Sequence, residues 1–566
     1  MSGGAAGRVS RRLLSSRPAT GAPRHYDVAI AGGGAVGSVL ARLLLDDASR
    51  SRPIRVALLE RRPSPPTMSE LGGTAAAPSA RAYALSPASL SYIGPGPLRS
   101  LLRHNRCGVY DSMQVWEHDG PAQLHFVGDD LRRAIDEGRL ADPREQLGGD
   151  ADEGGKGPWL GAVVEDAPLV SALWEELRED ERIDLLDNVQ IKSIESPRHE
   201  DVGKLEPPSQ VELSYTDVSS NEEDAITANL LVAADGANSF VRRTVGGFPM
   251  MTKSYGRKAV TCTVEISSGM NATAFQRFLP HGPIALLPVW GDGGDGGVRY
   301  ANVVWSTTAS EADHLRSLPP DEFIRALNHH LREGPNVNPP IFPGAGNLPP
   351  VLGTVAREVD SLLRTANTAL TMGTWTESPA RNFFRMPPES VRVVGPVMGF
   401  DLTASHVVTS GRGDGRTGGY AAPRVALVGD AAHTMHPMAG QGLNLGLGDA
   451  HSLSNLVKEA IDSGMDVGGT SLFLDRYNLE RLVQGFGTVG GVHALHEVFG
   501  VSGSMPGSVI DSNYGSSKSS LGGLQSLIGY SRSMGMNTIN SIGPVRRMLA
   551  EAAAGARPFK GYASAQ

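Results

Sequence analysis

The chain has 566 residues, which is more than one compact core usually holds, so we expect at least two domains. Its 52 Lys and Arg residues against 60 Asp and Glu residues give a formal net charge of −8. This balance argues against a nucleic acid as partner, because such proteins usually carry a basic face. Only two cysteines occur, Cys107 and Cys262, far apart and outside any CxxC. That excludes a cysteine-built metal site and a disulfide scaffold, and we expect both thiols to be reduced and buried.

The first 24 residues carry five arginines and four serines, and no acidic residue precedes Asp27. An Arg-rich, Ser-rich and acid-poor segment is typical of an organellar transit peptide; the alternative is a disordered tail. We expect residues 1–24 to be a targeting segment. No run of 18 or more apolar residues occurs, so the sequence predicts no membrane-spanning helix and leaves peripheral attachment to a membrane open.

Short apolar runs then alternate with helical patterns along the chain. "YDVAIAGG" (26–33) and "RVALLE" (55–60) are typical of buried parallel strands, with a helix from about Ala35 to Asp47 between them. "LLVAADG" (230–236) and "RVALVGDAAH" (424–433) predict two more such strands. From about 250 to 400 the pattern becomes sheet-like, as in "KAVTCTVEI", which predicts a substrate domain inserted between pieces of a nucleotide-binding domain. We expect Phe275 and Trp305 to lie in the core of its sheet.

Glycine is frequent, with 69 residues, and much of the excess lies in a few patches. These patches are residues 146–157, 291–297, 410–419 and 502–523. Such stretches cannot bury enough apolar surface to offset their ordering entropy, so we expect surface loops or insertions.

Gly32, Gly34 and Gly37 form a GxGxxG motif between the first strand and the first helix. The first glycine allows a tight turn, the second lets a pyrophosphate approach the backbone, and the third lets helix and strand pack closely. The helix start offers free N–H groups to phosphates. Glu60 ends the second strand, where a carboxylate can accept hydrogen bonds from ribose hydroxyls. The complete context predicts an adenine dinucleotide rather than a structural turn, and leaves NAD and FAD open.

Two later motifs add carboxylates at strand ends. "DGANSFVRR" (235–243) begins with Asp235, which by itself could equally be a helix cap. In "GDAAHTMHPMAGQGLNLGLGDAHSL" (429–453), Asp430 follows a buried strand, and a glycine-rich stretch leads into a helix whose free N–H groups favour negative charge, such as that of a reduced flavin. Asp430, His433 and His436 are spaced like metal ligands that would share one helix face. We nevertheless expect no metal, because a zinc site would normally need further ligands.

The three motifs "GGGAVG", "DGANS" and "GDAAH" appear in the order in which the flavoprotein aromatic monooxygenases carry them. The chain resembles this family, and within it the mitochondrial ubiquinone-biosynthesis hydroxylases, whose pattern His-Pro-x-Ala/Gly-Gly-Gln-Gly-x-Asn-x-Gly-x-x-Asp matches residues 436–449 without a gap. "RAYALSPAS" (81–89), "TAFQRFLPHGPIALLPV" (273–289) and "YSRSMGMNTINSIGPVRRML" (530–549) also resemble family segments. The resemblance covers most of residues 25–560 outside the glycine-rich insertions.

The resemblance implies an α/β fold with a Rossmann-like FAD-binding domain, an inserted mixed β-sheet substrate domain and a C-terminal helical region. The FAD-binding domain would comprise residues 25–245, with interleaved substrate-domain segments, and residues 406–490. The substrate domain would comprise residues 246–405, and the C-terminal region residues 491–566. We expect this C-terminal region to pack as a helix onto the domain; the alternative is an amphipathic element that faces a membrane.

The resemblance also implies a site for FAD. The Gly-rich turn would hold its pyrophosphate, Glu60 its adenosine ribose, Arg81 its phosphates or ribityl region, and Asp430 its ribityl chain. The backbone at Pro437, Gly440 and Gln441 would line the reactive flavin edge, with no acid–base residue assigned. The full set of residues expected at the cofactor is Gly32, Gly34, Ala35, Val36, Gly37, Glu60, Arg81, Asp235, Gly236, Gly429, Asp430, Gly442, Leu443 and Asn444.

The implied reaction is the hydroxylation at C5 of a polyprenyl 4-hydroxybenzoate-type ring. It would use O2 and proceed through a flavin C(4a)-hydroperoxide. The implied electron donor is ferredoxin with ferredoxin reductase, or NAD(P)H. Arg242–Arg243 and Arg546–Arg547 are candidates for a basic patch that docks an acidic ferredoxin. The implied location is peripheral, on the matrix side of the mitochondrial inner membrane, with other ubiquinone-biosynthesis proteins in a complex.

Two other functions stay open on the sequence alone. One is a different flavin-dependent oxidoreductase of prenylated lipids, and the other is a non-catalytic FAD-binding subunit of the biosynthetic complex. A flavin halogenase is disfavoured because its WxWxIP stretch has no match; the segment "PVWGDGG" differs from it.

Overall fold

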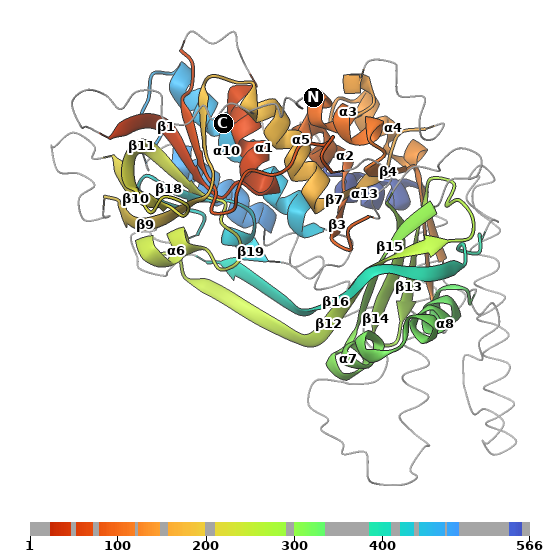
Figure 1. Ribbon diagram of the computed structural model, residues 1–566. Coiled ribbons are helices and arrows are strands. Elements are labelled where there is room, and N and C mark those ends of the chain that lie inside the picture. Colours follow the sequence, from red (N-terminus) through yellow and green to blue (C-terminus); the bar gives the residue numbers. More distant parts are fainter. Residues whose placement is uncertain are drawn as a thin grey trace, which may run out of the picture.

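The structure, a computed structural model, describes residues 23–46, 52–71, 78–118, 123–147, 157–197, 210–289, 299–333, 384–408, 419–434, 441–469, 473–485 and 543–556. Within these residues the strands form two sheets of eight strands each and a small sheet of three strands (Figure 1). The molecule is therefore mixed α/β, as the sequence predicts.

The first sheet contains the buried strands that the sequence predicts. Its order is β17 (Ala421–Ala422), β18 (Val425–Leu427), β11 (Glu223–Ala233), β1 (Arg24–Ala31), β2 (Val56–Leu59) and β8 (Ile183–Leu186), with β10 (Val211–Asp217) and β9 (Val189–Glu195) attached beside β11. β1 pairs in parallel with both β2 and β11. Its apolar residues are buried on both faces, which explains why this strand reads as a continuous hydrophobic run.

Three helices cover this sheet: α1 (Ala35–Leu45), α5 (Asp166–Arg178) and α10 (Gln441–Asp462). α1 packs against both α5 and α10, and all but one of its residues are buried (Figure 1). The helix ends at Leu45, slightly before its predicted end near Asp47, because Asp46 is its C-cap.

The second sheet has the order β19 (His433–Thr434), β16 (Ser390–Val407), β12 (Met250–Ile266), β15 (Arg299–Thr308), β14 (Gly282–Pro288), β13 (Thr273–Leu279), β5 (Ser112–Glu117) and β6 (Gln123–Val127). The long strands β12 and β16 run from the side of the first sheet to the far end of the second (Figure 1). Helices α7 (Ala309–Ser317) and α8 (Pro320–Leu331) pack on the second sheet. Phe275 and Trp305 lie in the hydrophobic core of this sheet, which confirms the prediction that they are core residues.

The third sheet, β3 (Ala82–Leu85), β7 (Gly161–Glu165) and β4 (Cys107–Tyr110), lies between the two large ones. Further helices among the described residues include α2 (Pro87–Ile93), α3 (Pro95–Arg103), α4 (Arg132–Asp136), α6 (Phe240–Val245) and α13 (Gly543–Ala554). Short 3-10 turns span Gly128–Leu131, Glu145–Leu147 and Gly429–Ala431. α13 packs its buried Ala550 and Ala554 beside Leu131 and Ala134.

The beginning of the first sheet and the end of β16 bear on the expected domain boundaries. Arg24, which the expected targeting segment includes, is the first residue of β1; it pairs with Ile226 and forms ion pairs with Asp184 and Asp224. The first sheet therefore includes Arg24. The expected domain boundary at 405 falls inside β16. Most of the four glycine-rich patches lies outside the described residues.

Cys107 and Cys262 are both free and buried. Burial raises the pKa of each thiol to about 12, so neither is a thiolate at neutral pH. Among the helices that the structure describes, none is long and apolar enough to cross a membrane.

Candidate functional site

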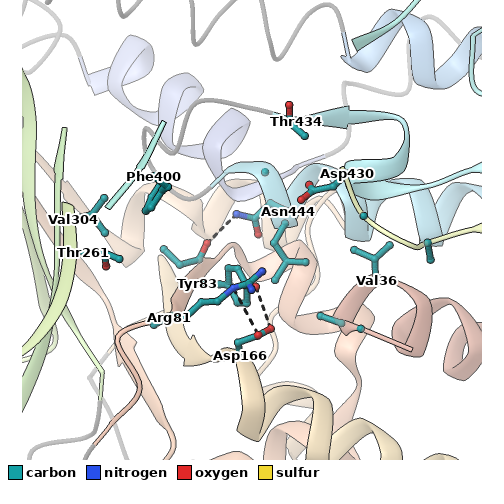
Figure 2. A pocket seen from close by; sticks show the side chains of 18 of the residues that line it. Val36, Arg81, Tyr83, Asp166, Thr261, Val304, Phe400, Asp430, Thr434 and Asn444 are labelled. Atoms are coloured by element: carbon teal, nitrogen blue, oxygen red, sulfur yellow. Dashed lines mark hydrogen bonds and ion pairs between the residues drawn. The ribbon is translucent and has the colours of Figure 1, made fainter. Parts of the chain in front are cut away.

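One cavity of about 1390 Å³ connects the Gly-rich turn of the first sheet with one face of the second sheet. Figure 2 shows Asp430 and Asn444 on one side of this cavity and Thr261, Val304 and Phe400 on the other. Twelve of the fourteen residues expected at the cofactor line it: Gly32, Gly34, Ala35, Val36, Glu60, Arg81, Asp235, Gly236, Asp430, Gly442, Leu443 and Asn444. Gly37 and Gly429 lie behind this lining and shape it.

The three motif glycines meet different constraints. Gly32 has φ +111°, and a Cβ there would lie 2.4 Å from the carbonyl oxygen of Ala234. A Cβ on Gly37 would lie 1.9 Å from the oxygen of Gly32, so helix and strand approach too closely for any side chain. A Cβ on Gly34 would meet nothing within 4 Å, because this residue faces the cavity. Two glycines thus serve packing, while Gly34 and the start of α1 leave the backbone open to an anionic ligand.

The peptide of Gly33 is fixed from both sides. Its N–H donates to Glu60 Oε2 at 2.7 Å, and its carbonyl accepts from Trp174 Nε1 at 2.9 Å and from Ser38 Oγ at 3.0 Å. Glu60 Oε1 accepts from the backbone and the guanidinium of Arg62. These contacts hold both the turn and the carboxylate in place at the cavity wall, and the sequence did not indicate Trp174 or Ser38.

Asp235 has two functions at once. Its Oδ2 accepts from the backbone N–H groups of Phe240 and Val241 in the first turn of α6, so Asp235 helps to cap this helix, although the N-cap residue itself is Ser239. Its Oδ1 is buried and receives no hydrogen bond from any residue that the structure describes. One oxygen is therefore structural, while the other is available to a hydroxyl of a bound molecule.

Arg81 is held by two neighbours that the sequence did not indicate. Its Nε donates to Tyr83 Oη at 2.9 Å, Tyr83 donates to Asp166 Oδ1 at 3.0 Å, and Arg81 and Asp166 form an ion pair at 3.6 Å (Figure 2). Burial alone would lower the pKa of Arg81, but Tyr83 and Asp166 raise it above its ordinary value. A permanent cation therefore lines the cavity.

Asp430 lies in the turn Gly429–Ala431, after β18. Its carboxylate opens to the cavity, and no residue of the described ranges forms a hydrogen bond or ion pair with it. The surrounding protein raises its pKa by desolvation, which His433 and Arg81 offset only in part. A carboxylate that lines a cavity and receives no hydrogen bond from the described residues suits a ligand that brings its own hydroxyl donors.

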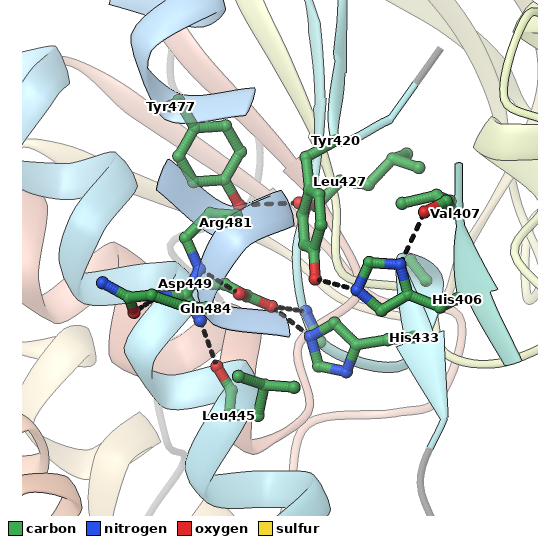
Figure 3. Close-up of polar contacts among 12 residues, drawn as sticks. His406, Val407, Tyr420, Leu427, His433, Leu445, Asp449, Tyr477, Arg481 and Gln484 are labelled. Atoms are coloured by element: carbon green, nitrogen blue, oxygen red, sulfur yellow. Dashed lines mark hydrogen bonds and ion pairs between the residues drawn. The ribbon is translucent and has the colours of Figure 1, made fainter. Parts of the chain in front are cut away.

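Asp449 on α10 holds this turn from behind (Figure 3). Its Oδ2 accepts from the N–H of Gly429 at 2.8 Å and lies 2.6 Å from His433 Nε2, and its Oδ1 accepts from Arg481 Nε at 2.6 Å. The carboxylate is fully buried, which alone would raise its pKa, but Arg481 and His433 lower it below its ordinary value. Asp449 therefore fixes the turn that carries Asp430.

The first turn of α10 closes the cavity with Gly442, Leu443 and Asn444. Asn444 Nδ2 donates to Ala84 O, and its Oδ1 accepts from Ser86 N, which ties α10 to β3 and α2. Its backbone, rather than its amide, is thus the part left for a flavin. Gln441 is the first residue of α10, while Pro437 and Gly440 lie outside the described residues.

Asp430 lies in a turn and His433 in β19, bound to Asp449, so these two residues share no helix face; His436 lies outside the described residues. One candidate for the docking patch is wrong. Arg546 cannot belong to a surface docking patch, because it is buried and paired with Asp130 at 2.9 Å. Arg242 is tied to the carbonyls of Ala431 and Ala237, which leaves Arg243 as the exposed member of its pair.

Comparisons with known proteins agree with this geometry. A protein-family model described as an FAD binding domain matches residues 410–485. The mitochondrial ubiquinone biosynthesis monooxygenase COQ6 of Homo sapiens is 28% identical over 496 residues, which cover 87% of this chain and 90% of that protein. COQ6 of Dictyostelium discoideum is 25% identical over 488 residues, 84% of each chain.

The fold has solved counterparts as well. The p-nitrophenol 4-monooxygenase of Pseudomonas putida matches with a TM-score of 0.55 at 17% identity, covering 94% of this chain and 100% of that one. The arrangement of a dinucleotide sheet beside a second sheet is thus that of aromatic hydroxylases. The chain is thus similar to the COQ6 ubiquinone biosynthesis monooxygenases over most of its length, and the matches together support an FAD-dependent aromatic monooxygenase.

Proposed function

We propose that this protein hydroxylates the ring of a polyprenyl 4-hydroxybenzoate-type intermediate at C5 during ubiquinone biosynthesis. The observation that carries the proposal is the single cavity shared by the Gly-rich turn and the second sheet, in which a flavin and an aromatic ring would meet. The names of the COQ6 relatives supply the pathway.

The residues present fit FAD. Gly34 and the start of α1 would receive the pyrophosphate, Glu60 the adenosine ribose, and the free oxygen of Asp235 and the carboxylate of Asp430 would accept from hydroxyls. When bound, FAD would supply the activation of O2, which is the chemistry of the cofactor rather than of the protein. The protein would orient the ring and exclude water from it.

The lining of the cavity supports a prenylated substrate. Beyond the polar end, the cavity reaches α13, and the walls there are apolar: Phe126, Leu160, Leu549 and Ala553. An apolar wall suits an isoprenoid chain, because such a chain binds by removing its surface from water. The chain would enter from this side, and the ring would lie between the second sheet and α10.

The first test uses the purified protein. It should be yellow, and its flavin should be reduced under anaerobic conditions by ferredoxin with ferredoxin reductase or by NAD(P)H. Bound flavin that neither donor reduces, with or without substrate, would favour the non-catalytic subunit instead.

The second test identifies the step. A strain that lacks the gene should accumulate a prenylated phenol without the C5 hydroxyl, detected by mass spectrometry. Accumulation of a later, already methoxylated precursor would refute the assignment.

Location and partners follow from the same proposal. We infer a peripheral position on the matrix side of the mitochondrial inner membrane, in contact with other ubiquinone-biosynthesis proteins; the relatives are named mitochondrial. Carbonate extraction of mitochondria should release the protein from the membrane, and protease should reach it only after the inner membrane is opened.

A further inference from the structure

The second sheet presents to the cavity one side-chain amide that has no hydrogen-bond partner among the described residues. Gln276 on β13 is 9% exposed and lines the cavity. Its side chain makes no hydrogen bond or ion pair with any residue in the described part of the chain. Most side-chain amides in a protein core bond to other residues, so an amide that opens to a cavity and bonds to none of the described residues is placed to bind a ligand there.

The register of the sheet places this amide at one end of a row. Gln276 lies opposite Ala285, Ala285 opposite Val304, and Val304 opposite Thr261, so the four side chains share the cavity face. Three strand spacings of roughly 4.8 Å separate the ends of this row by about 14 Å. Between them Ala285 and Val304 form a small, apolar floor, which is suited to the face of an aromatic ring.

The other end of the row lies beside the cofactor residues. Thr261 Oγ1 donates to the carbonyl oxygen of Ala80, the residue before Arg81. The Thr261 hydroxyl therefore already has a hydrogen-bond partner. The row of four cavity-facing side chains runs from Thr261, beside the segment of Arg81, to Gln276. A ring on the floor would have its near edge towards the cofactor and its far edge towards the amide.

A second buried glutamine, on the neighbouring strand, has a side-chain amide with hydrogen-bond partners and so differs from Gln276. Gln114 on β5 lies opposite Phe275, on the other face of the sheet. Its Nε2 donates to Arg385 O at 2.9 Å, and its Oε1 accepts from Arg385 N at 2.8 Å. The sheet thus satisfies the amide on its packed face and leaves the amide on its cavity face unsatisfied.

We propose that Gln276 binds the phenolic oxygen of the substrate ring. The inference rests on the proposed function and names the residue that would set the orientation of the ring. The amide oxygen accepts from the phenolic O–H, and the amide N–H groups donate to the phenolic oxygen, so one side chain satisfies both halves of a hydroxyl. The hydroxyl then determines which ring carbon faces the cofactor.

The test compares two probes on the FAD-loaded protein: geranylated 4-hydroxybenzoate and its 4-methoxy counterpart. Binding is measured from the change in the absorption spectrum of the bound flavin. Gln276→Leu should lower the affinity for the hydroxy probe about tenfold and the affinity for the methoxy probe far less. The reason is that only the hydroxy probe can donate a hydrogen bond to the amide. Equal losses for the two probes, or none, would overturn the proposal.

Gln114→Leu is the matched control. It removes the two hydrogen bonds to Arg385, so it should lower the melting temperature while leaving the affinity ratio of the two probes unchanged. Gln276→Leu should not lower the melting temperature, since it breaks no hydrogen bond. If Gln276→Leu is as destabilised as Gln114→Leu, the amide is structural and the proposal fails.

Failure of this proposal can be told from failure of the proposed function. A wild-type protein that binds FAD and the hydroxy probe, with Gln276→Leu behaving identically, refutes the role of Gln276 only. A protein that binds no FAD refutes the function itself.

Discussion

Asp430 and Asp449 lie close together around one turn, yet the protein treats their carboxylates in opposite ways. Asp449 is fully buried and receives Gly429 N–H, His433 and Arg481, and its pKa is lowered. Asp430 opens to the cavity, receives no hydrogen bond from the described part of the chain, and has a raised pKa. The difference shows how a site is prepared for a ligand: the donors available in the chain are used to fix the turn, and the carboxylate that the turn presents is left free.

The largest effect is expected from Asp449→Asn. The change removes a charge that Arg481 requires, and leaves that guanidinium buried without a counter-ion. We expect the free energy of unfolding of the apoprotein to fall by about 3–5 kcal/mol. Urea unfolding followed by far-UV circular dichroism measures it. A loss below about 1 kcal/mol, which is typical of surface ion pairs, would show that Asp449 is not the anchor of the turn.

Asp430→Asn should act on the ligand instead of the fold. We expect FAD affinity to fall by about 1.5–3 kcal/mol, because hydrogen bonds to a charged group are lost. The stability of the apoprotein should stay the same or rise, since the raised pKa of Asp430 shows that its charge is disfavoured there. FAD titration by flavin fluorescence and thermal unfolding of the apoprotein give the two values. Equal losses of stability in Asp430→Asn and Asp449→Asn would contradict the conclusion that only Asp449 serves the fold.

His433→Leu removes one of the three donors around Asp449 and leaves Gly429 N–H and Arg481 in place. We expect a loss of about 1–2 kcal/mol in the free energy of unfolding, smaller than for Asp449→Asn. The double variant Asp449→Asn with His433→Leu should lose less than the sum of the single losses, because the two residues share one interaction. Strict additivity would mean that His433 acts independently of Asp449.

The smallest effect is a dependence on pH that differs in sign between the two carboxylates. The stability that Asp449 contributes, with its lowered pKa, is present above the ordinary carboxyl pKa of about 3.9 and is lost as the pH falls through its folded value. Asp430 has a raised pKa, so its cost to the apoprotein disappears as the pH falls through that raised value.

The same titration should affect FAD. Hydroxyl donors of the ligand favour the ionised Asp430, so FAD affinity should weaken as the pH falls through its raised pKa, and this slope should vanish in Asp430→Asn. FAD titrations at a series of pH values on both proteins measure it. An unchanged slope in Asp430→Asn would assign the dependence to another group.

The parts of the fold that depend on neighbours along the chain were predictable from the sequence. The strand–glycine–helix unit from β1 to β2, the buried strands β11 and β18, and the core positions Phe275 and Trp305 follow from hydrophobic patterns and glycine spacing. Most of the predicted cofactor residues line one cavity, because the carboxyl ends of parallel strands meet at the same edge of a sheet.

The contacts that fix these residues were not predictable. Trp174 reaches Gly33 across 141 positions, and Arg546 reaches Asp130 across 416. Only the folded chain brings them together, and for this reason Arg546 was taken for a surface residue.

The sheet that carries Gln276 is assembled from distant parts of the chain, and this has a consequence for synthesis on the ribosome. β5 and β6 are translated early, but β5 pairs in parallel with β13, which emerges only after β12 has been made. Until then β5 and β6 can pair only with each other, and the edge of β5 that later pairs with β13 has no partner strand. A truncated product that ends before β13 would leave this hairpin exposed, and we expect such nascent chains to depend on chaperones.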